Sequence, residues 1–479
     1  MNIGRSCCLM SLTAVTVMMS AAFAAEDMKG AADNRSDQLS QRPYHVEKLG
    51  GNSLNMARYV AVTRSKSRNG CRYAQGSDAP GGYVMEIDGQ SGPVFDNLGE
   101  NGAVFSTDGK HVAYAAKKGS SWLVVVDGIP GHEFDKIGAP VFSADGKRVA
   151  YSAMRNRKAF VVVDGQPGSE YDEIMVNSPV FSFDGKRVAY AAKKGSNWLV
   201  VVDGHPGPEY DGIMVGSPVF SADGKRVAYA AEKGSNWLVV VDGQPGPEYV
   251  GIAKGFPIFS GDSKRVAYTT QKGDRQLVVV DGQIGPEYSG IGEGFPVFSD
   301  DGKRVAYVAA QDRKSFVVLD GQPVSKYEFS WGPVFSADGR RTAYLAQNGK
   351  KSFVVIDGQP GPEYVGIMNG SLVFSADGKR LAYIAKKENE KWVVVIDGQA
   401  SPEYDGLYPG TLVFSADGKH VAYVAKMKGK WLEKDKKYIV LDGQQGPEIQ
   451  TLACSPVFRN DGVMEYLESK SFVLYRVTK

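Results

Sequence analysis

The sequence predicts an all-β fold: a β-propeller of about ten or eleven four-stranded blades, each about 39 residues long. The first observation is a repeat. The segment PVFSADGKRVAY at 218–229 recurs along the chain, and Phe181, Phe220, Phe259 and Phe298 are 39 residues apart. The second is that a segment of the type WLVVVDGQ, as at 237–244, follows each copy. The third is that no stretch of residues 45–479 shows sustained helical periodicity with caps, which removes the support for parallel crossover folds.

Each unit divides into four short strands in order. PVFS is the first strand and ends at an Asp-Gly turn, where glycine supplies the positive φ of a tight hairpin. KRVAYAA is the second strand, with Val and Tyr on one face and small Ala on the other. WLVVV is the third strand, and its continuous apolar run is typical of a strand buried on both faces. A second Asp-Gly turn leads to the fourth strand, which contains Pro-Glu-Tyr.

The pattern Phe-Ser-Ala-Asp-Gly-Lys-Arg-Val-Ala-Tyr resembles the WD40-like repeat of TolB-type propellers. The same motif also occurs in the propeller domains of prolyl-oligopeptidase-like peptidases. The resemblance covers roughly residues 45–479 and implies a propeller blade rather than a particular activity.

The number of units predicts one large ring. Second-strand segments number eleven, from residues 58–62 to residues 463–466, and no linker or change of composition separates them. One ring is therefore favoured over two rings of five or six blades. Residues 45–49 are expected to supply the missing outer strand of the last blade.

Cys71 and Cys454 fall in connections that we expect on the same face of the first and last units. A disulfide between them would join these units in an exported protein. Two unrelated thiols are the alternative interpretation.

The N-terminal residues have the features of a targeting segment. Arg5 precedes an uncharged apolar stretch at 9–22, and Ala22-Phe23-Ala24 is a small-x-small cleavage site. We predict a signal peptide at 1–24, a flexible polar leader at 25–44 and the propeller at 45–479. The protein is thus expected to be exported, periplasmic or extracellular, with no membrane span in the mature chain.

The charges argue against nucleic acid as a partner, because 56 basic and 54 acidic side chains leave a net charge of only +2. The repeated Lys-Arg pair, as at Lys225 and Arg226, has two interpretations. It forms either a basic crown that attracts an acidic partner or a ladder of ion pairs with the Asp of each VVVDG segment. The matched charge totals favour the ladder.

Catalytic signatures are not found in the sequence. There is no Gly-x-Ser-x-Gly elbow and no His-Glu-x-x-His motif, and the five histidines are scattered. We therefore predict no catalytic, metal-binding or cofactor-binding residues and expect that the protein is not an enzyme. The aromatic residues that begin the third strands are expected to pack between blades rather than to form a sugar-binding platform; they include Trp122, Trp198, Trp237 and Trp392.

Binding sites are expected where the units differ from one another. Phe329 and Trp331 lie in one irregular connection, where an exposed tryptophan could anchor a partner, and Lys428 and Trp431 lie in an insert at 427–437. The predicted function is a non-catalytic scaffold for protein–protein interaction in the cell envelope or outside the cell. The alternatives are a carbohydrate- or cell-wall-binding propeller and, less favoured, a propeller hydrolase or lyase.

Overall fold

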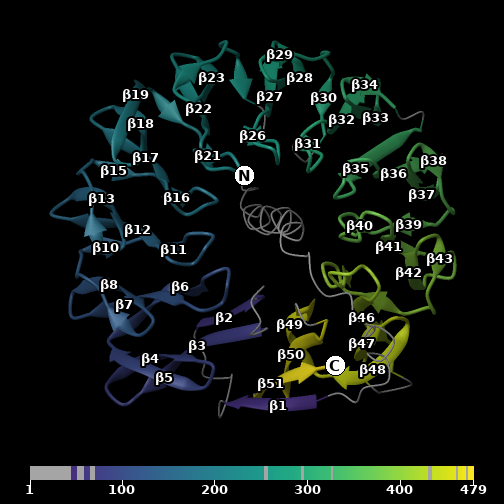
Figure 1. Ribbon diagram of the computed structural model, residues 1–479, viewed down its shortest axis with the longest axis horizontal. Coiled ribbons are helices and arrows are strands. Elements are labelled where there is room, and N and C mark those ends of the chain that lie inside the picture. The colour runs from purple at the N-terminus through teal and green to yellow at the C-terminus, as the bar shows by residue number, and fades with distance from the viewer. Residues whose placement is uncertain are drawn as a thin grey trace, which may run out of the picture.

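The protein was analysed as a computed structural model, which describes residues 45–50, 59–64, 71–252, 257–292, 296–324, 327–429, 434–459, 462–470 and 473–479. These residues form eleven antiparallel sheets, and the described ranges contain no helix. Figure 1 shows the sheets following one another around a ring. The prediction of an all-β propeller with many blades is confirmed. The predicted signal peptide and leader lie outside the described residues.

Every sheet has the same strand order from the inner to the outer side of the ring (Figure 1). The innermost strands, each split into two segments in seven sheets, are β2 (Tyr59–Arg64), β6 (Asn97–Phe105), β10 (Lys136–Ile137) with β11 (Val141–Phe142), β15 (Glu173–Ile174) with β16 (Val180–Phe181), β20 (Gly212–Ile213) with β21 (Val219–Phe220), β25 (Gly251–Ile252) with β26 (Ile258–Phe259), β30 (Gly290–Ile291) with β31 (Val297–Phe298), β35 (Phe329–Phe335), β39 (Gly366–Ile367) with β40 (Val373–Phe374), β44 (Gly406–Leu407) with β45 (Val413–Phe414), and β49 (Thr451–Phe458). The second strands are β3 (Cys71–Ala79), β7 (Val112–Lys118), β12 (Val149–Arg155), β17 (Val188–Lys194), β22 (Val227–Lys233), β27 (Val266–Lys272), β32 (Val305–Gln311), β36 (Thr342–Asn348), β41 (Leu381–Lys386), β46 (Val421–Met427) and β50 (Met464–Lys470).

The third and fourth strands complete each sheet. The third strands are β4 (Gly82–Ile87), β8 (Ser121–Val126), β13 (Lys158–Val163), β18 (Asn197–Val202), β23 (Asn236–Val241), β28 (Arg275–Val280), β33 (Lys314–Leu319), β37 (Lys351–Ile356), β42 (Trp392–Ile396), β47 (Lys436–Leu441) and β51 (Val473–Thr478). The outermost strands are β5 (Gln90–Phe95), β9 (Ile129–Pro130), β14 (Gln166–Pro167), β19 (His205–Tyr210), β24 (Gln244–Pro245), β29 (Gln283–Ile284), β34 (Gln322–Pro323), β38 (Gln359–Pro360), β43 (Gln399–Ala400), β48 (Gln444–Ile449) and β1 (His45–Gly50).

The turn between the third and fourth strands shows why the Asp-Gly pair recurs. Asp242 has φ 53° and Gly243 has φ 79°, so both central residues of the turn lie in the left-handed region. A two-residue hairpin of this kind matches the twist of the flanking strands, and Asp followed by Gly is one of its preferred sequences. The chain therefore reverses direction at the same place in each unit.

The two ends of the described chain meet in one sheet. β1 pairs antiparallel with β51, with His45 opposite Thr478 and Val46 opposite Val477. The prediction that residues 45–49 supply the outer strand of the last blade is confirmed by this pairing.

The first sheet differs from the prediction. We expected residues 58–62 to form its second strand and Cys71 to lie in the loop that follows, but residues 59–64 form the innermost strand and Cys71 begins β3. Cys454 lies within β49 rather than in a connection. The error arose because this unit lacks the PVFSADG segment that sets the strand count in the others. The side chains of both cysteines lie outside the described part, so their disulfide stays a prediction.

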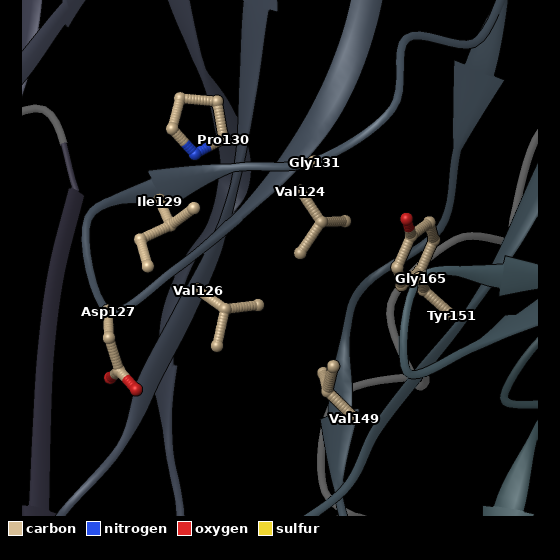
Figure 2. Close-up of a pocket in the computed structure, with 9 residues that line it drawn as sticks. All are labelled: Val124, Val126, Asp127, Ile129, Pro130, Gly131, Val149, Tyr151 and Gly165. Atoms are coloured by element: carbon tan, nitrogen blue, oxygen red, sulfur yellow. The ribbon is translucent and has the colours of Figure 1, made fainter.

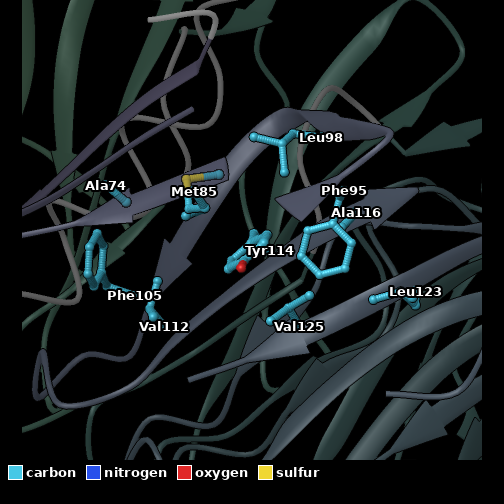
Figure 3. Close-up of a cluster of buried hydrophobic side chains, with 11 residues drawn as sticks. Ala74, Met85, Phe95, Leu98, Phe105, Val112, Tyr114, Ala116, Leu123 and Val125 are labelled. Carbon is cyan, nitrogen blue, oxygen red and sulfur yellow. The ribbon is translucent and has the colours of Figure 1, made fainter. Parts of the chain in front are cut away.

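The hydrophobic core lies between neighbouring sheets. In the cluster of Figure 3, Ala74 and Met85 from the sheet of β2–β5 pack against Tyr114 and Val125 from the sheet of β6–β9. A buried tyrosine from the outer side of one sheet meets a tyrosine in the second strand of the next, as at Tyr249 and Tyr268, whose rings are 6.3 Å apart at 68°. Edge-to-face packing of this kind adds to the stabilisation from area burial. Each sheet thus buries its faces against its two neighbours.

Candidate functional site

The turn between the first and second strands has a repeated hydrogen-bond pattern. Ser221 Oγ donates to Asp223 Oδ1 at 2.7 Å, Asp223 accepts the Lys225 N–H at 3.1 Å, and Ser221 Oγ accepts the Arg226 N–H at 3.0 Å. The hydrogen bond from Ser221, followed by that from the Lys225 amide, lowers the pKa of Asp223 below its usual value. The turn is therefore held by its own side chains, and its carboxylate is used within the structure.

The arginine of each Lys-Arg pair joins two sheets. Arg226 Nε donates to Asp242 Oδ2 at 2.8 Å in its own sheet, and its Nη1 donates to the Lys264 carbonyl of the next sheet at 2.7 Å. Its guanidinium also lies over the Phe259 ring, 5.1 Å from the centroid. We call this arrangement an arginine joint. Ion pairs and ring contacts of this kind are made by Arg148, Arg187, Arg226, Arg265, Arg304, Arg341 and Arg380.

The arginine joints decide between the two interpretations of the Lys-Arg pair. The arginines pair with the Asp of the VVVDG segments, as the ladder predicts. The preceding lysine is free to reach solvent: Lys225 is 83% exposed, with its Nζ 3.9 Å from Asp223. Each turn therefore places two cations beside two carboxylates, and the turns do not build up a net positive crown.

Loops on the inner side of the ring vary in sequence between units. Where the innermost strand is split, a short loop connects its two segments, and we call these the inner loops. Residues 175–179 link β15 to β16, and residues 214–218 link β20 to β21 (Figure 1). The loop sequences differ between sheets: MVNSP, MVGSP, MNGSL and YPGTL occur at equivalent places.

Hydroxyl groups hold several inner loops in place. Ser178 Oγ accepts the Ala191 N–H at 3.1 Å, and Ser217 Oγ accepts the Ala230 N–H at 3.2 Å. Each hydroxyl takes the place of a strand carbonyl in the ladder, so the backbone can leave the sheet without orphaning a buried donor. The loop tip then points away from the sheet, and Val176 is 74% exposed and Val215 60% exposed.

The predicted site at Phe329 and Trp331 is met only in part. Phe329 is 42% exposed at the start of β35. The expectation of an exposed Trp331 is wrong, because its side chain is half-buried and packs on the core that includes Leu345 and Leu381. β35 runs as one strand with a bulge between Trp331 and Val334, and Trp331 pairs with Leu345 in the sheet. The binding roles of Phe329 and Trp331 stay predictions.

The predicted site in the insert at 427–437 is only partly described. Lys428 is exposed, and its backbone N–H donates to Asp405 at 2.8 Å. Nearby, Lys426 pairs with Asp435 at 2.9 Å. Trp431 lies outside the described residues, so the roles of Lys428 and Trp431 stay predictions.

The aromatic residues of the third strands pack between sheets, as predicted. Trp198 and Trp392 lie against the cores of their sheets, and the Lys193 ammonium sits 5.7 Å from the centroid of the Trp198 ring. The core and the Lys193 side chain therefore both contact the Trp198 ring.

A cavity of about 280 Å³ lies between the sheets of β6–β9 and β10–β14 (Figure 2). Val124, Val126 and Ile129 face it from one sheet, and Val149 and Tyr151 face it from the next. Asp127 stands at its edge. This cavity was not predicted from the sequence. The sequence feature that could have indicated the cavity is Ile129, which stands where most units have Gln.

Candidate metal sites and candidate membrane-spanning helices are absent from the described ranges. No group of three His, Cys, Asp or Glu side chains comes close enough together there to hold a metal ion. The same ranges contain no helix of the length and apolarity needed to cross a membrane.

Comparison with known proteins shows likeness only at the level of structure. No family model matches the sequence, and no curated protein matches it. A eukaryotic initiation factor matches with a TM-score of 0.38 and 14% identity, over 70% of this chain and 97% of that one. TolB from Acinetobacter baumannii matches with a TM-score of 0.25 and 18% identity, over 47% of this chain and 62% of that one. The β-propeller domain of the Trilobed protease from Pyrococcus furiosus matches with a TM-score of 0.28 and 12% identity, over 57% of this chain and 97% of that one.

All three TM-scores are below 0.5, so the assignment of the fold rests on the strand order and pairing described above. Membership of the WD40-like repeat family stays a prediction.

Proposed function

We propose that the protein is an exported scaffold that binds a protein partner through its inner loops. The observation that carries the proposal is a contrast within each unit. The turns repeat between sheets and seven arginines form joints, whereas the inner loops range from MVNSP and MVGSP to MNGSL and YPGTL, and Val176 and Val215 are exposed to solvent. A constant framework that presents variable loops is typical of binding proteins.

The inner loops suit recognition because their shape is set before binding. The hydroxyl bonds of Ser178 and Ser217 tie each loop to the neighbouring strand, so little ordering is needed when a partner arrives. Covering large apolar side chains that a rigid loop exposes to water is energetically favourable. Two loops of this kind stand at equivalent positions in adjacent sheets, which favours an extended apolar contact over a small-molecule site.

Export is proposed from the sequence. The apolar stretch at 9–22 and the Ala22-Phe23-Ala24 site support cleavage after residue 24. Protein partners would then be sought among envelope or secreted proteins.

The test is chemical cross-linking and capture of envelope proteins on purified residues 25–479. Val176→Ser with Val215→Ser is expected to abolish capture of a reproducible protein partner. Val250→Ser with Val365→Ser is the matched control, because these valines are also exposed but precede the innermost strands rather than lying in inner loops. Equal capture by both double variants would overturn the role of the inner loops. Capture of glycan alone would favour the carbohydrate-binding alternative.

A further inference from the structure

The sheet of β6–β9 departs from the repeat at two positions that meet at one place. His111 stands where seven sheets carry the joint arginine, and Ile129 stands where nine units carry Gln or His. Asp127, which pairs with His111, and Ile129 itself both border the cavity of Figure 2. The two changes therefore alter the same small region of surface.

The first change leaves a carboxylate without its usual guanidinium. Asp127 Oδ2 lies 2.6 Å from His111 Nδ1, and an imidazole carries a charge only when it is protonated. Both side chains reach solvent, with 42% of His111 and 40% of Asp127 exposed. The hydrogen bonds that other joint arginines donate to the next turn, such as Arg187 Nη1 to the Lys225 carbonyl at 2.7 Å, have no counterpart from His111 among the described contacts. His111 Nδ1 takes the place of the arginine Nε at Asp127, and a guanidinium from outside would add the further donors that the imidazole lacks.

The second change makes the neighbouring surface apolar. Ile129 is 72% exposed, and the cavity beside it is lined by the buried side chains of Val124 and Tyr151. About 280 Å³ is small for a cofactor or drug-sized ligand, whose sites usually take about 300–1,000 Å³, and it suits one bulky side chain. An apolar group that enters would cover Ile129 and displace water from the cavity.

We propose that this cavity binds a peptide segment of a partner protein that carries a bulky aliphatic side chain next to an arginine. The aliphatic side chain occupies the cavity beside Ile129, and the guanidinium pairs with Asp127. Arginine suits this position because its planar fork can meet a carboxylate and a carbonyl together. The proposal goes beyond the inner loops and does not depend on them, because the cavity is lined by Ile129 and Pro130 of the outermost strand β9.

The probe is the peptide acetyl-Gly-Leu-Arg-Gly-amide. Its binding to purified residues 25–479 is measured by titration with saturation-transfer NMR. Acetyl-Gly-Leu-Glu-Gly-amide and acetyl-Gly-Ala-Arg-Gly-amide are the comparison peptides. We expect the Leu-Arg peptide to bind more tightly than either, since one lacks the cation and the other lacks the apolar group. Equal binding of all three peptides, or no saturable binding at millimolar concentration, would overturn the proposal.

Two variants restore the residues of the other sheets and so should fold. Ile129→Gln is expected to weaken the Leu-Arg peptide about tenfold, as for the loss of one large apolar contact. His111→Arg is expected to remove the preference for Arg over Glu while leaving the preference for Leu over Ala. Gln166→Ile is the control: it adds an exposed isoleucine beside Asp164, which Arg148 already neutralises at 2.8 Å. A gain of Arg preference in that control would contradict the role assigned to Asp127.

Discussion

Replacing Arg226 by methionine tests whether an arginine joint holds two sheets together. Methionine keeps much of the apolar stem but removes the hydrogen bonds to Asp242 at 2.8 Å and to the Lys264 carbonyl at 2.7 Å. It also removes the cation 5.1 Å from the Phe259 centroid. Of these contacts, those with Lys264 and Phe259 cross from the sheet of β20–β24 to the sheet of β25–β29. The change therefore weakens an interface and not only a turn.

The three contacts differ in strength. The ion pair contributes about 0.5 kcal/mol, because Arg226 is 30% and Asp242 42% exposed and solvent screens them. The charge-assisted hydrogen bond to the Lys264 carbonyl contributes about 1.5 kcal/mol. The cation over Phe259 adds about 0.5–1 kcal/mol at this partly exposed position. The unfolding free energy should fall by about 2.5–3 kcal/mol.

Urea unfolding followed by tryptophan fluorescence measures the loss. Lys225→Met is the matched control, since the same replacement at the adjacent residue removes a side chain that is 83% exposed. Its effect should stay within about 0.5 kcal/mol, as for other surface changes. If both variants unfold at the same urea concentration, the arginine joints do not hold the sheets together and the reasoning is refuted.

Three further predictions follow from other parts of the fold. Gly224→Ala should lower the free energy of unfolding by about 1 kcal/mol more than Gly204→Ala, as measured by urea unfolding. Both glycines have positive φ. A Cβ at Gly224 would lie 3.0 Å from Ser182 Cβ, whereas nothing lies within 4 Å of a Cβ at Gly204. Equal costs would contradict the close approach of neighbouring turns. Burial raises the pKa of Tyr114 to about 12, and an unfolded tyrosine ionises near about pH 10. The stabilisation from the neutral tyrosine is thus present below about pH 10 and is lost as the pH rises towards 12. The melting temperature should therefore fall between about pH 10 and 12. A melting temperature that does not change over this range would contradict the burial of Tyr114. The Cys71–Cys454 disulfide predicts a cross-linked peptide in a non-reduced digest, and alkylation of both thiols without reduction would exclude it.

The candidate sites depended more on tertiary contacts than the framework did. The sequence predicted that the Lys-Arg pair meets the Asp of the VVVDG segment, because both belong to one repeat. It did not predict that Arg226 also reaches Lys264 and Phe259, which lie about one repeat further along the chain. Trp331 was expected to be exposed, yet its pairing with Leu345 on the next strand places it against the core. Such contacts join residues that no local pattern relates.

The sequence by itself determined the repeating unit and its four strands. These features follow from hydrophobic alternation and from Asp-Gly turns, which act over a few residues. Only the tertiary structure decided which side chains the inner loops expose and where His111 and Ile129 come to share one cavity. The reason is that a propeller buries its core between sheets, so the surroundings of each residue are set by neighbours from the adjacent units.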